Sequence, residues 1–263
     1  MHSPKLVLAL AALLLGALTL PARAGERVDL LLALTADVSR SMDDEEFQLQ
    51  RSGYVEALSN PRVIDAIRSG PNGRIAVMFI EWSSFPSQKI VADWTTIGDA
   101  ATARQFADAL AKAPRSFSGK TSISSAIDFA MAQFDRAPYE SHEGLRRTID
   151  VSGDGFNNSG REVTHARDDA VARGATINGL VILKEPAAPL VLEHAQPPAI
   201  VDYYRDRVIG GPGAFVMVAE DIESFGRALT SKLIAEIAQA HQPRHAGLRE
   251  TKGAPAGSSM LGR

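Results

Sequence analysis

Short hydrophobic runs alternate with amphipathic segments along most of the chain, beginning at residue 28. Residues 28–36 form an almost unbroken hydrophobic run, and similar runs follow at residues 74–82, 147–152 and 176–183. Such runs predict strands that are buried on both faces, as in a parallel sheet covered by helices. Two weaker runs, at residues 89–94 and 214–218, predict further strands, and we expect the first of these at an edge of the sheet.

Segments with hydrophobic residues at helical spacing separate these runs, and they predict helices at residues 43–58, 99–113, 121–134, 161–173 and 222–239, with a short one ending near residue 68. Regular alternation of strands and helices predicts one α/β domain. Its sheet should be doubly wound and mostly parallel, with helices on both faces. We expect the strand order 3-2-1-4-5-6, with residues 28–36 in the middle.

Polar side chains follow the first hydrophobic run at alternate positions: Asp37, Ser39 and Ser41. Alternate residues of an extended chain point the same way, and open α/β sheets bind ligands at this edge. Carboxylate and hydroxyl oxygens suit Mg²⁺, Mn²⁺ or Ca²⁺. The alternative is a polar turn in which Ser41 caps the next helix. This segment alone leaves both interpretations open.

Two distant segments add to this pattern. Thr121 lies in a glycine-bearing loop just before a predicted helix, and Asp154 lies between two glycines after the run at residues 147–152. In this order, the three pieces resemble the von Willebrand factor A-like domain, whose metal-ion-dependent adhesion site is Asp-x-Ser-x-Ser, then Thr, then Asp. One departure is Gly153, where that family commonly has Thr or Ser. The resemblance covers roughly residues 27–240.

The resemblance implies a metal site formed by five residues: Asp37, Ser39, Ser41, Thr121 and Asp154. The two aspartates balance the charge of a divalent cation, with Mg²⁺ expected first and Mn²⁺ or Ca²⁺ as alternatives. An open coordination position would accept a carboxylate of a partner protein or other macromolecule. The implied function is therefore cation-dependent binding without catalysis. Residues 81–83 and 152–158 further resemble a bacterial secreted subfamily of unknown function.

Two rival functions remain at this stage. A magnesium-dependent phosphohydrolase on a similar sheet often has Asp-x-Asp after the first strand, but here Ser39 replaces the second Asp and so removes the general acid. A periplasmic small-molecule receptor would need two lobes. The pattern around Asp150 mimics a calcium-binding loop, but its twelfth position is Arg161 rather than Glu. We expect Asp150 to cap or orient backbone near the strand end.

For three more residues near the motif, we expect a structural role rather than a role in the site. Trp82, at the end of a predicted strand, is expected in the core, although it could also belong to a binding surface. Asn157 and Asn158 are expected as turn residues, with a place at the rim of the site as the alternative. The six histidines are scattered along the sequence, so a zinc site is not expected.

Composition limits the remaining function classes. The formal net charge of −3 and the absence of a basic stripe argue against nucleic-acid binding. The chain has no cysteine, which excludes disulfides and thiol catalysis. Residues 1–24 are typical of a signal peptide that is too short to span a bilayer, so we expect a periplasmic or secreted protein with no stable membrane span after cleavage. We expect the domain at residues 25–242, a surface loop at 184–198, and a disordered tail at 243–263.

Overall fold

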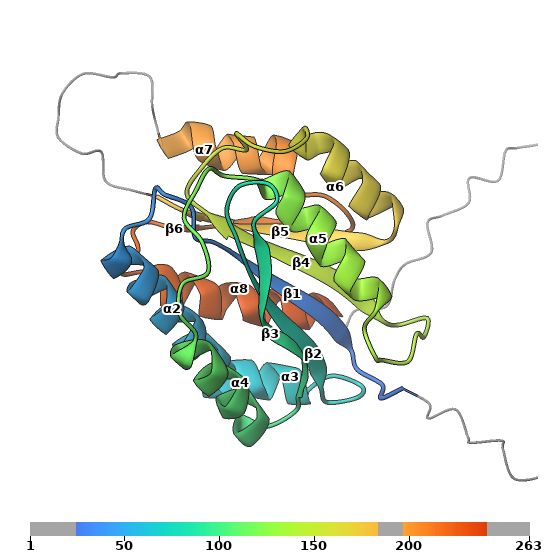
Figure 1. The fold of residues 1–263 in the computed structure, drawn as a ribbon. Coiled ribbons are helices and arrows are strands. Elements are labelled where there is room, and N and C mark those ends of the chain that lie inside the picture. The colour runs from blue at the N-terminus through green and yellow to red at the C-terminus, as the bar shows by residue number, and fades with distance from the viewer. Residues whose placement is uncertain (1–24, 184–196, 241–263) are drawn as a thin grey trace, which may run out of the picture.

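The computed structural model describes residues 25–183 and 197–240, and these form a six-stranded sheet between two layers of helices (Figure 1). The strands are β1 (Leu30–Asp37), β2 (Ile75–Trp82), β3 (Gln88–Ile97), β4 (Arg146–Gly153), β5 (Ala175–Ile182) and β6 (Val216–Ala219). Their order is β3-β2-β1-β4-β5-β6, and β3 runs antiparallel to its neighbour while the other pairs are parallel. The predicted doubly wound sheet and its strand order are therefore confirmed.

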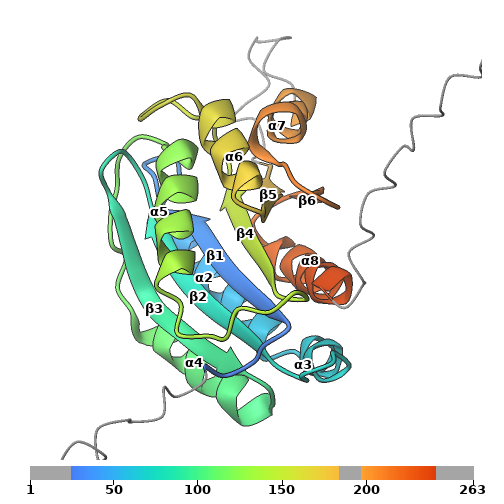
Figure 2. The ribbon, with the colours of Figure 1, turned by 90° about the vertical axis from the view of Figure 1, so that its right-hand side faces the viewer.

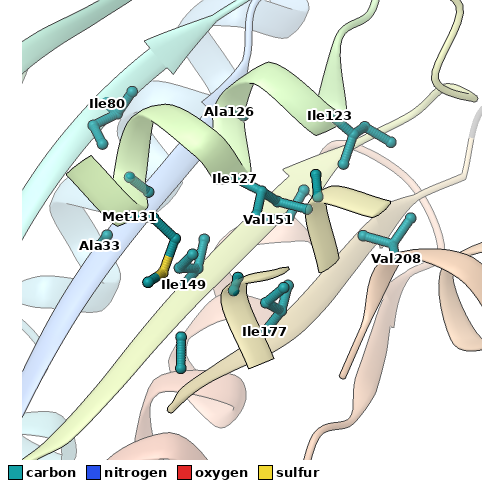
Figure 3. Close-up of a cluster of buried hydrophobic side chains, with 14 of the residues drawn as sticks. Ala33, Ile80, Ile123, Ala126, Ile127, Met131, Ile149, Val151, Ile177 and Val208 are labelled. Atoms are coloured by element: carbon teal, nitrogen blue, oxygen red, sulfur yellow. The ribbon is translucent and has the colours of Figure 1, made fainter. Parts of the chain in front are cut away.

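The first hydrophobic run takes the centre of the sheet because both of its faces are covered. All eight residues of β1 are buried. Leu31 and Ala33 belong to one hydrophobic cluster, whereas Leu32 and Leu34 belong to a second cluster on the opposite face. Figure 3 shows the first cluster, in which Ala33 and its neighbours Ile80 and Ile149 pack under a helix.

The helices divide between the two faces of the sheet, as the two views in Figures 1 and 2 show. On one face lie α5 (Ile123–Asp135), α6 (Val163–Ala172), α7 (Pro197–Tyr203) and the π-helical turn η1 (Tyr204–Val208). On the other face lie α2 (Asp44–Leu58), α3 (Pro61–Arg68), α4 (Ala100–Lys112) and α8 (Phe225–Ala240). Each layer contributes its own hydrophobic cluster, so the core has two halves separated by the sheet.

The start of α2 differs from one interpretation of the sequence. Asp43, not Ser41, caps this helix: its side chain accepts a hydrogen bond from the Glu46 N–H at 2.8 Å, and the Glu46 carboxylate accepts one from the Asp43 N–H at 2.8 Å. This reciprocal arrangement is a capping box. Because Asp43 provides the cap, the Ser41 hydroxyl is available for other contacts.

Several expectations fall on residues outside the described ranges. These are the signal peptide at residues 1–24, the tail at residues 243–263, and most of the loop expected at residues 184–198. The last two residues of that expected loop, Pro197 and Pro198, already belong to α7. Among the described residues, no helix combines the length and hydrophobicity needed to cross a membrane.

Candidate metal centre

The candidate site lies at the carboxyl ends of β1 and β4, the two central strands of the sheet. After β1 the chain continues to β2 and β3, whereas after β4 it continues to β5 and β6 on the other side. Open α/β sheets bind ligands at the carboxyl ends of the strands where the strand order reverses in this way. Asp37 is the last residue of β1, and Asp154 follows Gly153 at the end of β4.

The structure brings all five predicted site residues together. The Thr121 hydroxyl donates a hydrogen bond to the Ser39 hydroxyl at 3.3 Å. The Ser39 hydroxyl in turn lies 3.1 Å from the Ser41 hydroxyl. The Ser41 hydroxyl donates in turn to the Asp154 carboxylate at 2.8 Å. The Asp37 carboxylate accepts a bond from the Ser39 N–H at 2.7 Å. The clustering is thus observed, while the role of these residues as metal ligands stays a prediction.

The site is buried on one side and accessible on the other. Asp37, Ser39 and Thr121 are at most 5% exposed. Ser41 is exposed to solvent and Asp154 is partly exposed. A ligand from solution would therefore approach along the side formed by Ser41 and Asp154.

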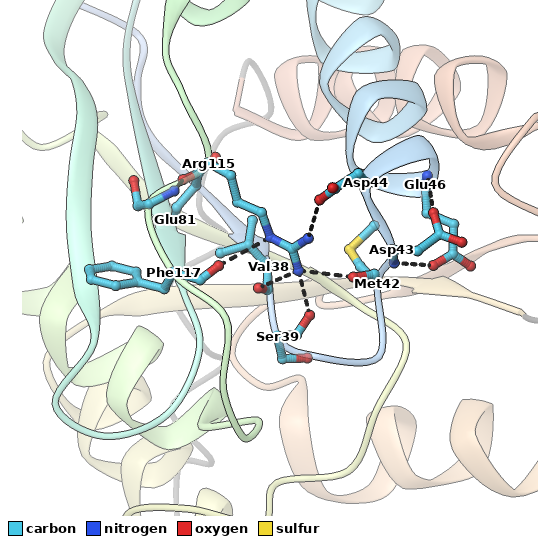
Figure 4. A network of polar contacts seen from close by, with 10 residues as sticks. Val38, Ser39, Met42, Asp43, Asp44, Glu46, Glu81, Arg115 and Phe117 are labelled. Carbon is cyan, nitrogen blue, oxygen red and sulfur yellow. Dashed lines mark hydrogen bonds and ion pairs between the residues drawn. The ribbon is translucent and has the colours of Figure 1, made fainter.

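Arg115 holds the loop that carries the Asp-x-Ser-x-Ser pattern (Figure 4). Its guanidinium donates to the backbone carbonyls of Val38 at 3.0 Å, Ser39 at 2.8 Å and Met42 at 2.9 Å. All three bonds come from one terminal nitrogen, Nη2, so its two hydrogens are shared among the three carbonyls. Arg115 thereby fixes the backbone that presents the Ser39 and Ser41 hydroxyls.

A buried ion pair supports the Arg115 loop in turn. Glu81 accepts a hydrogen bond from Arg51 with one carboxylate oxygen and from the Ser116 N–H with the other, at 2.8 Å. Arg51 also donates to the carbonyl of Ala113 at 3.1 Å. Sequence analysis did not assign a role to Arg115 or Arg51. Glu81 did give a signal, because a charged residue inside a buried strand needs a partner.

Asn157 and Asn158 connect the loop after β4 to the segment around Thr121. The Asn158 side chain accepts a hydrogen bond from the Thr121 N–H at 2.9 Å, and the Asn158 N–H donates to the Thr121 carbonyl at 2.9 Å. The Asn157 side chain accepts from the Ser124 N–H at 3.0 Å. The expectation that they serve as turn residues therefore misses these side-chain contacts, which keep Asp154 and Thr121 in a fixed relation.

Close packing explains why glycine occupies position 153, where the von Willebrand factor A-like pattern commonly has Thr or Ser. A Cβ atom on Gly153 would lie 2.9 Å from the Tyr204 hydroxyl and 3.1 Å from an Asp37 carboxylate oxygen. The Tyr204 hydroxyl, from η1, is fully buried and has no hydrogen-bond partner among the described residues. Burial and the nearby carboxylates of Asp37 and Asp154 raise the pKa of Tyr204 well above its ordinary value. Glycine at position 153 thus makes room for a phenol beside the site.

Asp150 has a partner that sequence analysis did not anticipate. Its carboxylate lies 2.7 Å from the Lys232 ammonium of α8, which also lies 2.6 Å from the Glu236 carboxylate. Burial raises the pKa of Asp150, and it raises the pKa of Glu236 to about 7. Although burial opposes the charge of Lys232, the two carboxylates raise its pKa overall. The expectation that Asp150 caps backbone is therefore replaced by a buried ion-pair cluster.

Trp82 is fully buried, as expected.

The donor set fits a hard divalent cation. It consists of two carboxylates and three hydroxyls, and all of their ligating atoms are oxygens of the kind that Mg²⁺ and Ca²⁺ prefer. Within the described part of the chain, no three His, Cys, Asp or Glu side chains gather where they could hold a metal ion. Any cation at this edge would therefore depend on the serine and threonine hydroxyls as well as on Asp37 and Asp154.

Comparison with known proteins identifies a family match over most of the chain. The model of the family described as "Protein of unknown function (DUF1194)" matches residues 27–241. No curated protein matches the chain by sequence.

Several solved structures share the fold. The pilus adhesin SpaC from Lactobacillus rhamnosus GG aligns with a TM-score of 0.58 and 14% identity over 83% of this chain and 32% of its own. Proximal thread matrix protein 1 from the mussel byssus, solved with a zinc-occupied MIDAS motif, aligns with a TM-score of 0.52 and 14% identity over 81% of this chain and 46% of its own. A von Willebrand factor type A protein from Catenulispora acidiphila aligns with a TM-score of 0.51 and 14% identity over 81% and 43%.

This chain therefore spans less than half the length of these three structures. At such low identity the likeness shows the fold alone, and that fold is von Willebrand factor A-like.

Proposed function

We propose that this chain, which belongs to the DUF1194 family of proteins of unknown function, is a divalent-cation-dependent binding module and not an enzyme. A cation held by Asp37, Ser39, Ser41, Thr121 and Asp154 would accept a carboxylate oxygen of a partner macromolecule. Mg²⁺ is the first candidate, with Mn²⁺ and Ca²⁺ as alternatives. The proposed location is the periplasm or the extracellular space, with residues 1–24 removed as a signal peptide and residues 25–242 forming the module.

One observation carries this proposal: three hydroxyls and the Asp154 carboxylate, from three distant segments, form a continuous chain of contacts. Thr121 contacts Ser39, Ser39 contacts Ser41, and Ser41 contacts Asp154, although 113 positions separate Ser41 from Asp154. Neutral hydroxyls add ligands without adding negative charge, so a divalent cation there keeps its attraction for an external anion. The fold it shares with a pilus adhesin and a thread matrix protein supports binding as the general role.

Titration of the purified chain with Mg²⁺ and Mn²⁺ tests the proposal. A cation that binds the native state alone should raise the free energy of unfolding by about 3 kcal/mol at a concentration of about 100 times Kd. Asp37→Ala should abolish this gain and the heat of binding measured by calorimetry. Thr121→Val, which keeps the shape of the side chain and removes one hydroxyl, should weaken binding at least severalfold.

Asp65→Asn provides the matched control, because Asp65 is an exposed carboxylate on α3, outside the site. This variant should bind the cation as the wild type does. Equal cation binding by the wild type and by Asp37→Ala would refute the assignment of the site.

A further inference from the structure

Two phenylalanine side chains are conspicuously exposed in the described part of the chain. Phe85 is 64% exposed and Phe156 is 48% exposed. Aromatic side chains, phenylalanine included, are enriched at protein–protein interfaces relative to the rest of the surface. Both rings lie on loops that border the candidate metal centre: Phe85 follows β2, and Phe156 follows Asp154 by two positions.

Contacts with a neighbouring tyrosine hold Phe156 in place. Its ring meets the Tyr203 ring edge to face, with 4.9 Å between centroids and an angle of 65°. The next residue, Asn157, donates its backbone N–H to the Tyr203 hydroxyl at 3.2 Å. One side of the Phe156 ring is therefore packed while the rest faces solvent, as in a preorganised contact residue.

The Phe85 loop is attached to both segments that carry the site. The Phe85 N–H donates to the Ser159 hydroxyl at 3.2 Å, which connects it to the loop that carries Phe156. The Ser83 carbonyl accepts from the Ser122 N–H at 2.9 Å. A Cβ atom on Gly119 would lie 2.7 Å from the Ser84 hydroxyl, so these loops also touch beside Lys120. The loops that carry Phe85 and Phe156 thus both contact the segment that presents Thr121.

Two basic residues lie beside the site. Arg40 and Lys120 are exposed and lie directly beside Ser39, Ser41 and Thr121 in the sequence. The Arg40 N–H donates to the Gly119 carbonyl at 2.8 Å, so the two basic residues come from joined loops. Among the acids at the start of α2, Asp43 and Glu46 form the helix cap and Asp44 pairs with Arg115, whereas Glu45 is exposed to solvent.

We propose that the partner is a protein segment with an Asp or Glu flanked by nonpolar side chains. The carboxylate would meet the cation, and the nonpolar neighbours would pack on Phe85 and Phe156, which we term the aromatic rim. This inference rests on the proposed cation-dependent function and specifies its ligand class. A carboxylate on a cell-wall sugar would also fill the metal position, but the hydroxyl-bearing ring next to it is more polar than a Leu or Phe neighbour.

An array of short immobilised peptides provides the test. Each peptide has a central Asp, Glu, Asn or Gln, with Gly, Ser, Leu or Phe on either side, and the array is probed with the full chain in Mg²⁺ or in excess chelator. We expect binding in Mg²⁺ to Asp and Glu peptides, at least tenfold stronger with Leu or Phe neighbours than with Gly or Ser. Asn and Gln peptides should not bind.

Substitutions in the aromatic rim distinguish the preference for nonpolar neighbours from the binding of the cation. The double variant Phe85→Ser/Phe156→Ser should lose the preference for nonpolar neighbours yet keep its stabilisation by Mg²⁺. Phe85→Leu should retain most of the preference, because Leu preserves a nonpolar contact. Binding that needs Mg²⁺ and a carboxylate but ignores the neighbours would overturn the rim and leave the proposed function intact. Failure of the wild type to bind Mg²⁺, Mn²⁺ and Ca²⁺ would overturn the proposed function itself.

Self-association of this chain is the alternative explanation for the aromatic rim. If sedimentation shows a dimer in the wild type that disappears in the double serine variant, the rings pack against a second copy of this chain, and the proposed peptide partner is wrong. A monomer at the same concentration, combined with neighbour-dependent peptide binding, supports the proposal.

Discussion

At the scale of single residues, two fully buried tyrosines differ in what their hydroxyls contact. The Tyr54 hydroxyl lies 2.6 Å from the Ser152 hydroxyl, whereas the Tyr204 hydroxyl has no hydrogen-bond partner among the described residues. A buried polar group without a partner costs about 1–3 kcal/mol. The position of Tyr204 beside Asp37 is therefore a local weakness in the fold.

This difference predicts opposite effects of the same substitution. In the absence of cation, Tyr204→Phe should raise the free energy of unfolding by about 1 kcal/mol, because it removes an unpaired hydroxyl. Tyr54→Phe should lower it by about 1 kcal/mol, because it leaves Ser152 without this partner. Denaturant unfolding of both variants in chelator measures the two changes. A loss of stability in Tyr204→Phe similar to that in Tyr54→Phe would show that the Tyr204 hydroxyl is satisfied in solution.

At the scale of elements, Arg115 determines the order of the loop between β1 and α2. Arg115→Met keeps most of the nonpolar stem but removes the donors to Val38, Ser39 and Met42. We expect a loss of about 2 kcal/mol in stability, because hydrogen bonds from charged groups are stronger than neutral ones. Hydrogen exchange should become faster at the backbone amides of this loop.

Arg161 provides a matched control for that substitution. It pairs with Asp128 and Asp169, and its side chain is 40% exposed. Exposed ion pairs contribute little, so Arg161→Met should change stability by less than about 1 kcal/mol and leave exchange in the loop after β1 unaltered. Equal effects of the two substitutions would contradict the assigned role of Arg115.

A second element-scale prediction concerns the contact between α8 and β4. Burial raises the pKa of Glu236 to about 7 from an ordinary value of 4.5. Between about pH 4.5 and pH 7, the folded state therefore holds a proton on Glu236 that the unfolded state has released. The stability that protonated Glu236 contributes to the folded protein is fully present below about pH 4.5. It is lost as the pH rises toward 7. Relative to Glu236→Gln, the wild type should lose about 2 kcal/mol of stability between pH 5 and pH 7.5.

Denaturant unfolding at several pH values measures this difference. Asp65→Asn, which changes an exposed carboxylate on α3, should follow the wild-type pH profile. If Glu236→Gln and the wild type have parallel profiles, the Glu236 carboxyl does not hold a proton in the folded state near neutral pH.

At the scale of the whole molecule, the sequence predicts what depends on local pattern. The hydrophobic runs and their alternation with helices were sufficient for the sheet and for the position of β1, because burial on both faces leaves a signal in every strand. The family pattern also picked out five residues that the structure brings together, although their role as metal ligands stays a prediction. It could not predict the partner of Asp150, since Lys232 lies 82 positions away and carries no local signal. The contacts of Arg115 and Tyr204 escaped prediction for the same reason.

The whole molecule should bind ligands without turning over phosphate esters. Ser39 occupies the position where a related phosphohydrolase would carry a general acid, and its hydroxyl contacts Ser41 and Thr121. A serine hydroxyl does not protonate a leaving group effectively near neutral pH. The full chain in Mg²⁺ should therefore hydrolyse p-nitrophenyl phosphate no faster than Asp37→Ala does. Hydrolysis that disappears in Asp37→Ala but persists in Phe85→Ser/Phe156→Ser would identify an enzyme, because it would require the site and not the aromatic rim.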